Sequence, residues 1–289
     1  MRIFHHSKEN SALQDSASSP HAGLSKPIKA TRFRRFSTLA TIAILKHFRP
    51  QRGRVLLLTK RLCVKYGPLI NLSEASAMEF VARNTSIPTP RVRCSFVRNG
   101  CTYIVMDRIR GEHIGHNWVS RSPESKAKIY AQLKRMVKQM RAISPPGPGV
   151  SDVDGGAIYD CRLPGPSLKF GPFDTIHDFH KYLHGGLEPH PDHFPEISQL
   201  IEMHNGPWPP PVFTHGDLSS LNILARGDDV VGIIDWETAG WFPHYWEYTT
   251  AWQVNPQNYF WREEIDNFLD AMPRELAMEQ IRLKYFGDF

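Results

Sequence analysis

The fold of this 289-residue chain is decided by residues 213–222, Phe-Thr-His-Gly-Asp-Leu-Ser-Ser-Leu-Asn, together with residues 230–237, Val-Val-Gly-Ile-Ile-Asp-Trp-Glu. The first segment places Asp217 after a short apolar run and Asn222 five residues further on. The second ends its apolar run at Asp235, thirteen residues beyond Asn222. Short runs rich in Val, Ile and Phe favour strands, so the pattern predicts polar side chains at strand ends. An ordinary hairpin with Asp and Asn in its turns is the alternative, but it requires all these positions to coincide by chance.

These polar side chains are the set that phosphoryl transfer requires. One carboxylate accepts the proton of an attacking hydroxyl, while an amide and a second carboxylate hold the magnesium that bridges the nucleotide phosphates. We therefore assign the catalytic base to Asp217 and the metal ligands to Asn222 and Asp235. His215 is expected to orient the loop, because Asp217 already fills the role of base. Glu237 is expected either to bind a second ion or to face a cationic substrate.

The motifs resemble those of the aminoglycoside phosphotransferase and choline kinase superfamily, which shares the fold of the protein kinases. The residues that carry the resemblance are His215-Gly216-Asp217, Asn222 and Ile234-Asp235-Trp236-Glu237. The similarity covers residues 52–289, and it is closest to fungal members that continue as residues 235–241 and 245–248 do here, Asp-Trp-Glu-Thr-Ala-Gly-Trp and Tyr-Trp-Glu-Tyr. It implies a bilobal α+β fold, with a small antiparallel-sheet N-lobe and a mainly helical C-lobe.

The resemblance also implies ATP and Mg²⁺ as cofactors and the hydroxyl of a small molecule as phosphate acceptor. Members of the superfamily phosphorylate antibiotics, choline, sugars and other hydroxyl compounds. One catalytic centre serves many pockets in such a fold, so these motifs do not identify the acceptor.

An N-lobe is expected at residues 33–110. Apolar runs at residues 55–58 and 62–66 predict a hairpin and place Lys65 inside a strand, and Glu74 follows in the first turn of a predicted helix. A kinase uses such a Lys to position the α- and β-phosphates and a helix Glu to hold the Lys. Lys65 and Glu74 are therefore candidate nucleotide-binding residues. A surface Lys on an edge strand, with a Glu favoured by the helix dipole, is the alternative.

The segment before Lys65 departs from the kinase pattern. Gly53 is the only glycine near it, and a single strand is expected ahead of the Lys strand, so the lid over the phosphates is predicted to be short. A second hairpin is predicted around Arg98-Asn99-Gly100. It leads into the linker between the lobes, where the resemblance implies that the main chain of Asp107 and Ile109 contacts the adenine.

A C-lobe is expected at residues 111–289. Its five histidines between residues 177 and 193 lack the partners of a closed metal site and are interpreted as a histidine-rich surface; they are His177, His180, His184, His190 and His193. Most of the aromatic residues beyond Asp235 are expected in the core. Trp241 and Trp246, with Glu237 and Glu247 nearby, are candidates for a cage around a cationic acceptor.

The net charge of +6 is unevenly distributed. Residues 1–60 carry twelve Lys or Arg and two acidic residues, whereas residues 61–289 carry 23 basic and 27 acidic residues. The catalytic body is therefore slightly acidic, which disfavours nucleic acid as a partner. No run of eighteen apolar residues occurs, so no membrane span is expected. The four cysteines, Cys63, Cys94, Cys101 and Cys161, lack metal spacing and are expected to be reduced thiols.

The basic N-terminal region divides into two parts. Residues 1–32 are predicted to be a disordered tail, and residues 33–48 show a helical apolar pattern with Arg and Lys interspersed. We interpret the helix as an amphipathic segment packed on the N-lobe. A mitochondrial transit peptide is the alternative, so a cytoplasmic location is expected and a mitochondrial one stays open.

Three functions are compatible with these observations. An ATP- and Mg²⁺-dependent phosphotransferase acting on a small-molecule hydroxyl is favoured. A nucleotide-binding pseudokinase or interaction module without turnover is the alternative, because the lid is short. A protein kinase is disfavoured, since Ser219 stands where a Lys is expected and no Ala-Pro-Glu segment follows Asp235. The sequence does not indicate the oligomeric state.

Overall fold

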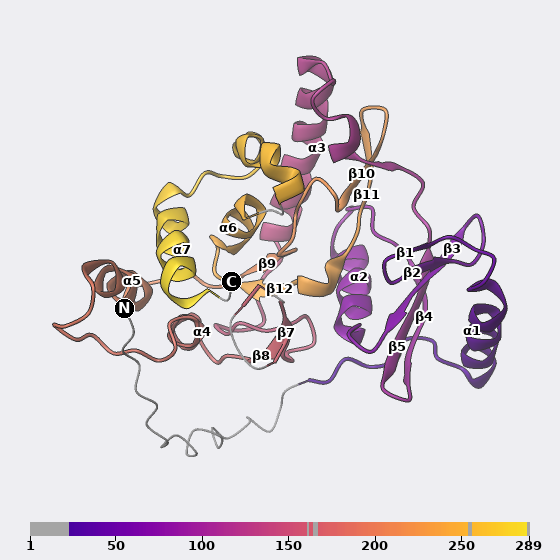
Figure 1. Ribbon diagram of the computed structural model, residues 1–289, viewed down its shortest axis with the longest axis horizontal. Coiled ribbons are helices and arrows are strands. Elements are labelled where there is room, and N and C mark those ends of the chain that lie inside the picture. Colours follow the sequence, from indigo (N-terminus) through magenta and orange to yellow (C-terminus); the bar gives the residue numbers. More distant parts are fainter. Residues whose placement is uncertain (1–22, 161, 164–166, 254–255, 288–289) are drawn as a thin grey trace, which may run out of the picture.

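A computed structural model describes residues 23–160, 162–163, 167–253 and 256–287, and it confirms the expected bilobal α+β fold (Figure 1). The N-lobe contains a five-stranded antiparallel sheet in the order β1-β2-β3-β5-β4. Its strands are β1 (Gln51–Arg52), β2 (Val55–Leu57), β3 (Leu62–Gly67), β4 (Val92–Arg98) and β5 (Cys101–Asp107). Asn99 and Gly100 both have positive φ between β4 and β5, as the predicted two-residue turn requires.

Two helices cover opposite faces of this sheet (Figure 1). They are α1 (Arg32–Leu45) and α2 (Leu72–Asn84). Successive side chains of β3 point to opposite faces, so Val64 packs in the cluster that contains Ile42 of α1. Cys63 packs in the cluster that contains Met78 of α2. Lys65 therefore lies on the α2 side of the sheet, toward the C-lobe. Of the tail predicted for residues 1–32, residues 1–22 lie outside the described residues. Ile28 forms two backbone hydrogen bonds with Ser95 of β4, and α1 begins at Arg32, so the prediction of disorder is wrong for the described end of the tail.

Two strands precede the Lys strand, so the prediction of a single strand there is wrong. β1 pairs with β2 through Gln51↔Leu56 and Arg52↔Val55, and Gly53 occupies the turn with a φ of 55°. A two-residue strand is too short to produce an alternating pattern, which is why the sequence does not reveal it. The lid is short but complete.

The chain enters the C-lobe through β6 (Glu112–His113), so the expected boundary at residue 110 falls between β5 and β6. The other strands are β7 (Ile158–Tyr159), β8 (Lys169–Phe170), β9 (Val212–Thr214), β10 (Ile223–Arg226), β11 (Asp229–Ile233) and β12 (Gly240–Phe242). The α-helices are α3 (Pro123–Arg141), α4 (Ile176–Leu183), α5 (Pro195–Asn205), α6 (Trp246–Trp252) and α7 (Pro273–Phe286). Short 3₁₀ helices are η1 (Ile114–Asn117), η2 (Trp236–Thr238), η3 (Pro256–Glu263) and η4 (Ile265–Asn267).

Two of the five histidines interpreted as a surface are in the C-lobe core, so that interpretation is wrong for them. His180 and His184 of the α4 region are buried, together with His204 of α5. The His180 and His204 rings stack at 4.3 Å, and His180 Nε2 lies 2.9 Å from the Tyr245 hydroxyl. Histidines on the inner face of an amphipathic helix are buried with the apolar residues around them, whereas His177 and His190 are exposed.

Cys63, Cys94 and Cys101 are free thiols, and Cys161 lies outside the described residues. Within the described ranges, no helix combines the length and apolar character that crossing a membrane requires.

Candidate active site

The loop that carries Asp217 is fixed by a buried carboxylate. Glu247, in the first turn of α6, accepts hydrogen bonds from the backbone N–H groups of His215 and Gly216 at 2.6 and 3.1 Å. Gly216 has a φ of 80°, and a Cβ there would lie 2.8 Å from the Thr238 carbonyl oxygen. Only glycine fits this position. The expectation that Glu247 faces a substrate is therefore wrong, because its two oxygens hold the loop.

His215 connects the two segments that the sequence pointed to. Its Nε2 donates to the Ile234 carbonyl oxygen at 3.0 Å, and its Nδ1 accepts from the Asp217 N–H at 3.1 Å. These bonds require the neutral tautomer with its proton on Nε2. The ring thus aligns the loop of Asp217 with the residue before Asp235.

Asp217 and Asn222 contact each other directly. The Asn222 amide nitrogen donates to Asp217 Oδ2 at 2.7 Å and to the Asp217 carbonyl oxygen at 2.9 Å. The Asp217 side chain is 41% exposed, so a hydroxyl from solution can reach it. Because the amide nitrogen of Asn222 is occupied by Asp217, its side-chain oxygen is the atom left for a metal ion.

Lys65 meets three carboxylates. Its Nζ lies 2.9 Å from Glu74, 2.6 Å from Asp235 and 2.9 Å from Glu237. The four side chains come from β3, α2, the end of β11 and η2, so the cluster joins the two lobes. Asp235 adopts the left-handed conformation, with φ 64° and ψ 61°. That conformation is uncommon for a residue with a Cβ, although Asp tolerates it better than most, and residues that adopt it cluster at functional sites.

The charges in this cluster do not balance. Burial lowers the pKa of Lys65, but Glu74, Asp235 and Glu237 outweigh that effect and raise it. Burial raises the pKa of Glu74 to about 7, against the opposing effect of Lys65 and with a contribution from Asp235 and Glu237. One ammonium faces three carboxylates whose oxygens lie within 4.8 Å of one another. Hard oxygen ligands with excess negative charge suit a divalent cation such as Mg²⁺.

Asp107 and Ile109 line a cavity between the N-lobe sheet and the C-lobe. Apolar side chains surround them there: Val55, Leu57, Cys63, Met106, Leu224 and Ile234. The Asp107 carboxylate is paired with Arg93 at 2.6 Å, and the backbone N–H of Asp107 donates to the Arg91 carbonyl oxygen. The Asp107 main chain can therefore meet a base through its carbonyl oxygen.

Arg162 is the residue at this site that the sequence did not indicate. It forms a two-pronged ion pair with the buried Asp160 carboxylate, and it donates to the Gly216 carbonyl oxygen. Its Nη1 lies 3.9 Å from Asp217 Oδ1. Arg162 stands in a loop without periodicity, and an Asp two residues before an Arg is too common a pattern to signal a site.

The aromatic cage expected at Trp241 and Trp246 does not exist. Both side chains are almost fully buried. Trp241 contacts Phe213 at a ring distance of 5.6 Å, and Trp246 stacks on Phe242 at 5.4 Å. The first pair joins β12 to β9, and the second joins α6 to β12. Large aromatic rings fill the core at both places.

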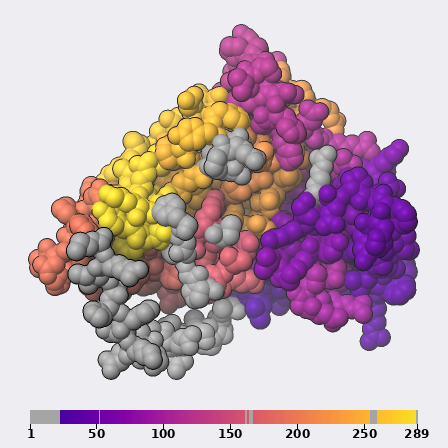
Figure 2. Space-filling model, viewed as in Figure 1, coloured from indigo at the N-terminus to yellow at the C-terminus, as the bar shows by residue number. Residues whose placement is uncertain are grey.

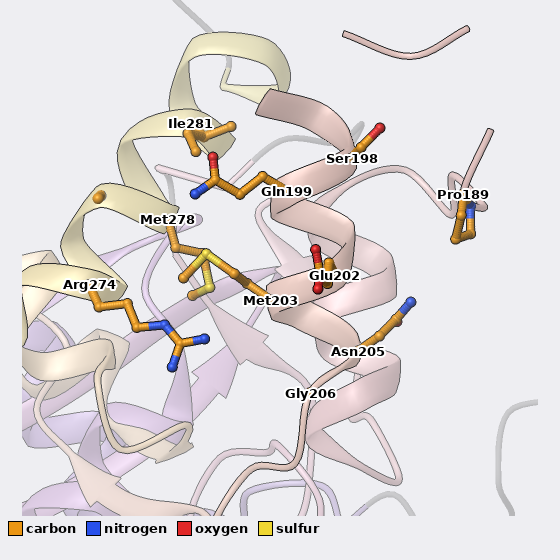
Figure 3. A pocket seen from close by; sticks show the side chains of 11 residues that line it. Pro189, Ser198, Gln199, Glu202, Met203, Asn205, Gly206, Arg274, Met278 and Ile281 are labelled. Carbon is orange, nitrogen blue, oxygen red and sulfur yellow. The ribbon is translucent and has the colours of Figure 1, made fainter. Parts of the chain in front are cut away.

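A second hollow lies far from this chemistry. It has a volume of about 930 Å³ and lies between α5 and α7, where Met203, Met278 and Ile281 meet Glu202 and Arg274 (Figure 3). It is larger than the inter-lobe cavity of about 180 Å³. None of the residues assigned to catalysis or nucleotide binding lines it, so the inter-lobe cavity is the better candidate site.

A cleft between two lobes, a buried Lys–Glu pair and a catalytic loop with Asp and Asn define a kinase-like phosphotransferase. The model of the phosphotransferase enzyme family matches residues 71–280. The chain therefore belongs to this family and is a phosphotransferase. The family resemblance of the motifs is confirmed.

Solved structures of aminoglycoside phosphotransferases are similar in fold, and those of three such enzymes are examples. Aminoglycoside phosphotransferase APH(4)-Ia is 14% identical, with 86% of this chain and 89% of that chain covered and a TM-score of 0.59. The gentamicin–APH(2")-IIa complex is 16% identical, with 89% and 87% covered and a TM-score of 0.53. APH(3'')-Id from Streptomyces rimosus, in complex with ADP and streptomycin, is 14% identical, with 89% and 98% covered and a TM-score of 0.52. No curated protein matches the chain.

Proposed function

We propose that the protein transfers the γ-phosphate of ATP to the hydroxyl of a small molecule in a Mg²⁺-dependent reaction. The observation that carries the proposal is the convergence of Asp217, Asn222 and Asp235 beside the Lys65–Glu74 pair. A similar fold binds ADP and streptomycin in APH(3'')-Id, which supports a nucleotide in the cleft and a hydroxyl compound beside it.

The cavity beside Asp107 and Ile109 fits the base end of a nucleotide. Its volume of about 180 Å³ is below the ~300–1,000 Å³ of pockets that enclose a drug-sized ligand. The base would therefore lie inside, and the phosphates would extend toward Lys65. Lys65 would keep its contact with Glu74 and exchange its contacts with Asp235 and Glu237 for phosphate oxygens.

The residues present fit a magnesium site. Asp235, Glu237 and the side-chain oxygen of Asn222 would hold the ion, which would neutralise charge on the phosphates when bound. Asp217 would orient the acceptor hydroxyl and accept its proton, since it is the exposed carboxylate of the loop. Arg162 would keep Asp217 and the Gly216 carbonyl in place during this step.

Trp241, Trp246 and Glu247 do not form a cation-binding cage for the acceptor, because all three are in the core. The guanidinium of Arg162 beside Asp217 is paired with the buried Asp160 carboxylate, so it leaves no net positive charge next to the reacting hydroxyl. We therefore propose that the acceptor is held by groups other than an aromatic cage. The pseudokinase alternative loses its motivation, since β1 completes the lid.

The test has two stages. The thermal midpoint is first measured with and without millimolar MgATP, for the wild type and for Asp235→Asn. Ligand at a hundred times its Kd adds about 2.7 kcal/mol, so the wild type should gain a few degrees and the variant should not. Hydroxyl compounds are then screened for stimulated ADP release.

The catalytic assignment is tested with the best acceptor from that screen. Asp217→Asn should lower kcat by about 10²- to 10⁴-fold and leave nucleotide affinity unchanged. Asp229→Asn, which changes an exposed carboxylate at the start of β11, is the matched control. Full activity in Asp217→Asn, or the absence of any Mg²⁺-dependent nucleotide binding, would contradict the proposal.

A further inference from the structure

Helix α1 has an apolar face on each side. Leu39, Ile42 and Leu45 pack on the N-lobe sheet. Phe33, Phe36 and Ile44 point away from the protein and are 78%, 71% and 63% exposed. A surface helix normally has a polar outer face, but the outer face of α1 is apolar and no described residue covers it.

The exposed side chains form one stripe. Residues 33, 36, 40 and 44 follow the spacing of a single helix face, and they extend over about 16 Å of the helix axis. Phe48, 80% exposed, continues the stripe just beyond the helix. Single exposed apolar residues are ordinary, but a contiguous group marks an interaction site. We call Phe33, Phe36, Ile44 and Phe48 the outer stripe.

The surroundings of the outer stripe are strongly basic. Residues 23–60 contain ten Lys or Arg and neither Asp nor Glu. Arg32 and Lys46 flank the stripe near its two ends, and both are exposed. Arg34 and Arg35 turn back toward the protein and donate to the carbonyl oxygens of Arg93 and Ala30. Lys29 pairs with Glu79 at 3.5 Å, and the other basic side chains of this region that the structure describes have no acidic partner. The surface around the stripe therefore combines large apolar side chains with positive charge.

We propose that the outer stripe and its basic flanks are a docking surface for an anionic lipid bilayer. An in-plane helix inserts Phe, Leu and Ile at the boundary of headgroups and acyl chains, while Lys and Arg attract anionic headgroups. A second copy of this chain fits less well, because two such surfaces would bring their positive charges together.

Docking of the outer stripe on a bilayer would leave the active site open. α1 lies on the outer edge of the N-lobe (Figures 1 and 2). The sheet separates it from Lys65, because Val64 packs toward α1 and the next side chain of β3 points to the opposite face. A docked molecule therefore keeps its cleft accessible to nucleotide and acceptor.

The test is cosedimentation of the full chain with vesicles of phosphatidylcholine alone and of phosphatidylcholine containing phosphatidylserine. The wild type should bind the anionic vesicles and be released by salt. Replacing three stripe residues (Phe33→Ser, Phe36→Ser and Ile44→Ser) should weaken binding by more than about a hundredfold. Arg32→Gln with Lys46→Gln, which leaves the apolar side chains in place, should weaken it about thirtyfold.

The matched control replaces three exposed apolar residues away from α1, through Leu69→Ser, Val119→Ser and Phe194→Ser. It should bind vesicles as the wild type does. Absence of wild-type binding to anionic vesicles overturns the proposal, and so does an equal loss in the control. A dimer in light scattering that the stripe variant abolishes, without vesicle binding, would instead assign the surface to a second copy.

Discussion

At the scale of single residues, Asp217 is held by groups that lie outside its own motif. Asn222 binds one carboxylate oxygen, and Arg162 approaches the other from a loop more than fifty residues earlier in the chain. Arg162 is itself fixed by the buried carboxylate of Asp160. Its guanidinium also holds the Gly216 carbonyl, so it positions both the carboxylate and the backbone of the loop.

Removing this support should impair turnover more than binding. Arg162→Gln is expected to lower kcat by about a hundredfold, because a displacement of about 1 Å at the base costs that much. KM for ATP should hardly change, since Arg162 does not line the nucleotide cavity. Arg162→Lys keeps the charge but loses the two-pronged contact with Asp160, so its kcat should lie between those of the wild type and Arg162→Gln. Steady-state kinetics measure both constants.

Arg135→Gln, which changes an exposed arginine of α3, is the control for this prediction. It should retain the wild-type kcat. An Arg162→Gln enzyme with unchanged kcat, or one that loses ATP affinity and turnover equally, would show that Arg162 does not position the base.

At the scale of elements, α6 fixes the catalytic loop through Glu247. A buried carboxylate that accepts two backbone hydrogen bonds contributes more than a neutral acceptor. Glu247→Gln is therefore expected to lower the free energy of unfolding by about 2 kcal/mol, because an amide nitrogen would face one of the N–H donors. Urea unfolding measures the change, with Glu263→Gln, an exposed neighbour in η3, as control. An unfolding free energy equal to that of the wild type would contradict this role.

Another element-scale feature is the packing of α4 on α5 through histidine rings. Burial lowers the pKa of His180 to about 3. Burial also lowers the pKa of His204, and the neighbouring His184 and Arg282 lower it further. An unfolded histidine has a pKa of about 6.5. The unfolded chain therefore binds more protons below that pH, and acid destabilises the fold.

The contribution of these histidines to the free energy of unfolding should accordingly be level above about pH 6.5 and fall between about pH 6.5 and pH 3, by up to about 1.4 kcal/mol per pH unit for each histidine. Glu74, whose pKa burial raises to about 7, acts in the opposite direction in this range, so the variant is compared with the wild type at each pH. His204→Phe should keep the stability at pH 7.5, because neither ring nitrogen of His204 has a hydrogen-bond partner among the described residues, and should flatten the acid slope. Urea unfolding over a pH series measures both. An unchanged slope in the variant would contradict the argument.

Elements differ in how far the sequence predicts them. The Asn-Gly hairpin and the apolar face of α3 are encoded locally, and so is the loop from His215 to Asn222. The strand β1, with two residues, and the Arg162 loop have no periodicity, so only their tertiary contacts reveal them. The burial of Trp241 and of His180 depends on which neighbour each helix or strand meets. The chemistry of the site was therefore predictable, but its supporting contacts and the role of the aromatic residues were not.

At the scale of the whole molecule, Lys65 joins the two lobes. Its ammonium lies on the N-lobe sheet and contacts Asp235 and Glu237 of the C-lobe, while Glu74 of α2 is buried beside it. Without the ammonium, the fully buried Glu74 would have no compensating charge. Removing one partner of a buried pair typically costs about 3–5 kcal/mol. The contacts to Asp235 and Glu237 contribute less, because these side chains are partly exposed.

Lys65→Met should therefore destabilise the protein by about 3 kcal/mol at pH 8, in addition to abolishing nucleotide binding. The difference from the wild type should shrink as the pH falls. Without Lys65 the pKa of Glu74 rises further above its unfolded value, so the folded variant takes up a proton that the unfolded chain does not yet bind, and stability is regained. Comparing variant and wild type at each pH removes the contribution of the histidines.

The double variant Lys65→Met/Glu74→Gln should recover most of the loss at pH 8, because no unpaired charge stays buried. A pH-independent difference, or a double variant less stable than Lys65→Met, would mean that packing of the Lys65 side chain, and not its charge, joins the lobes.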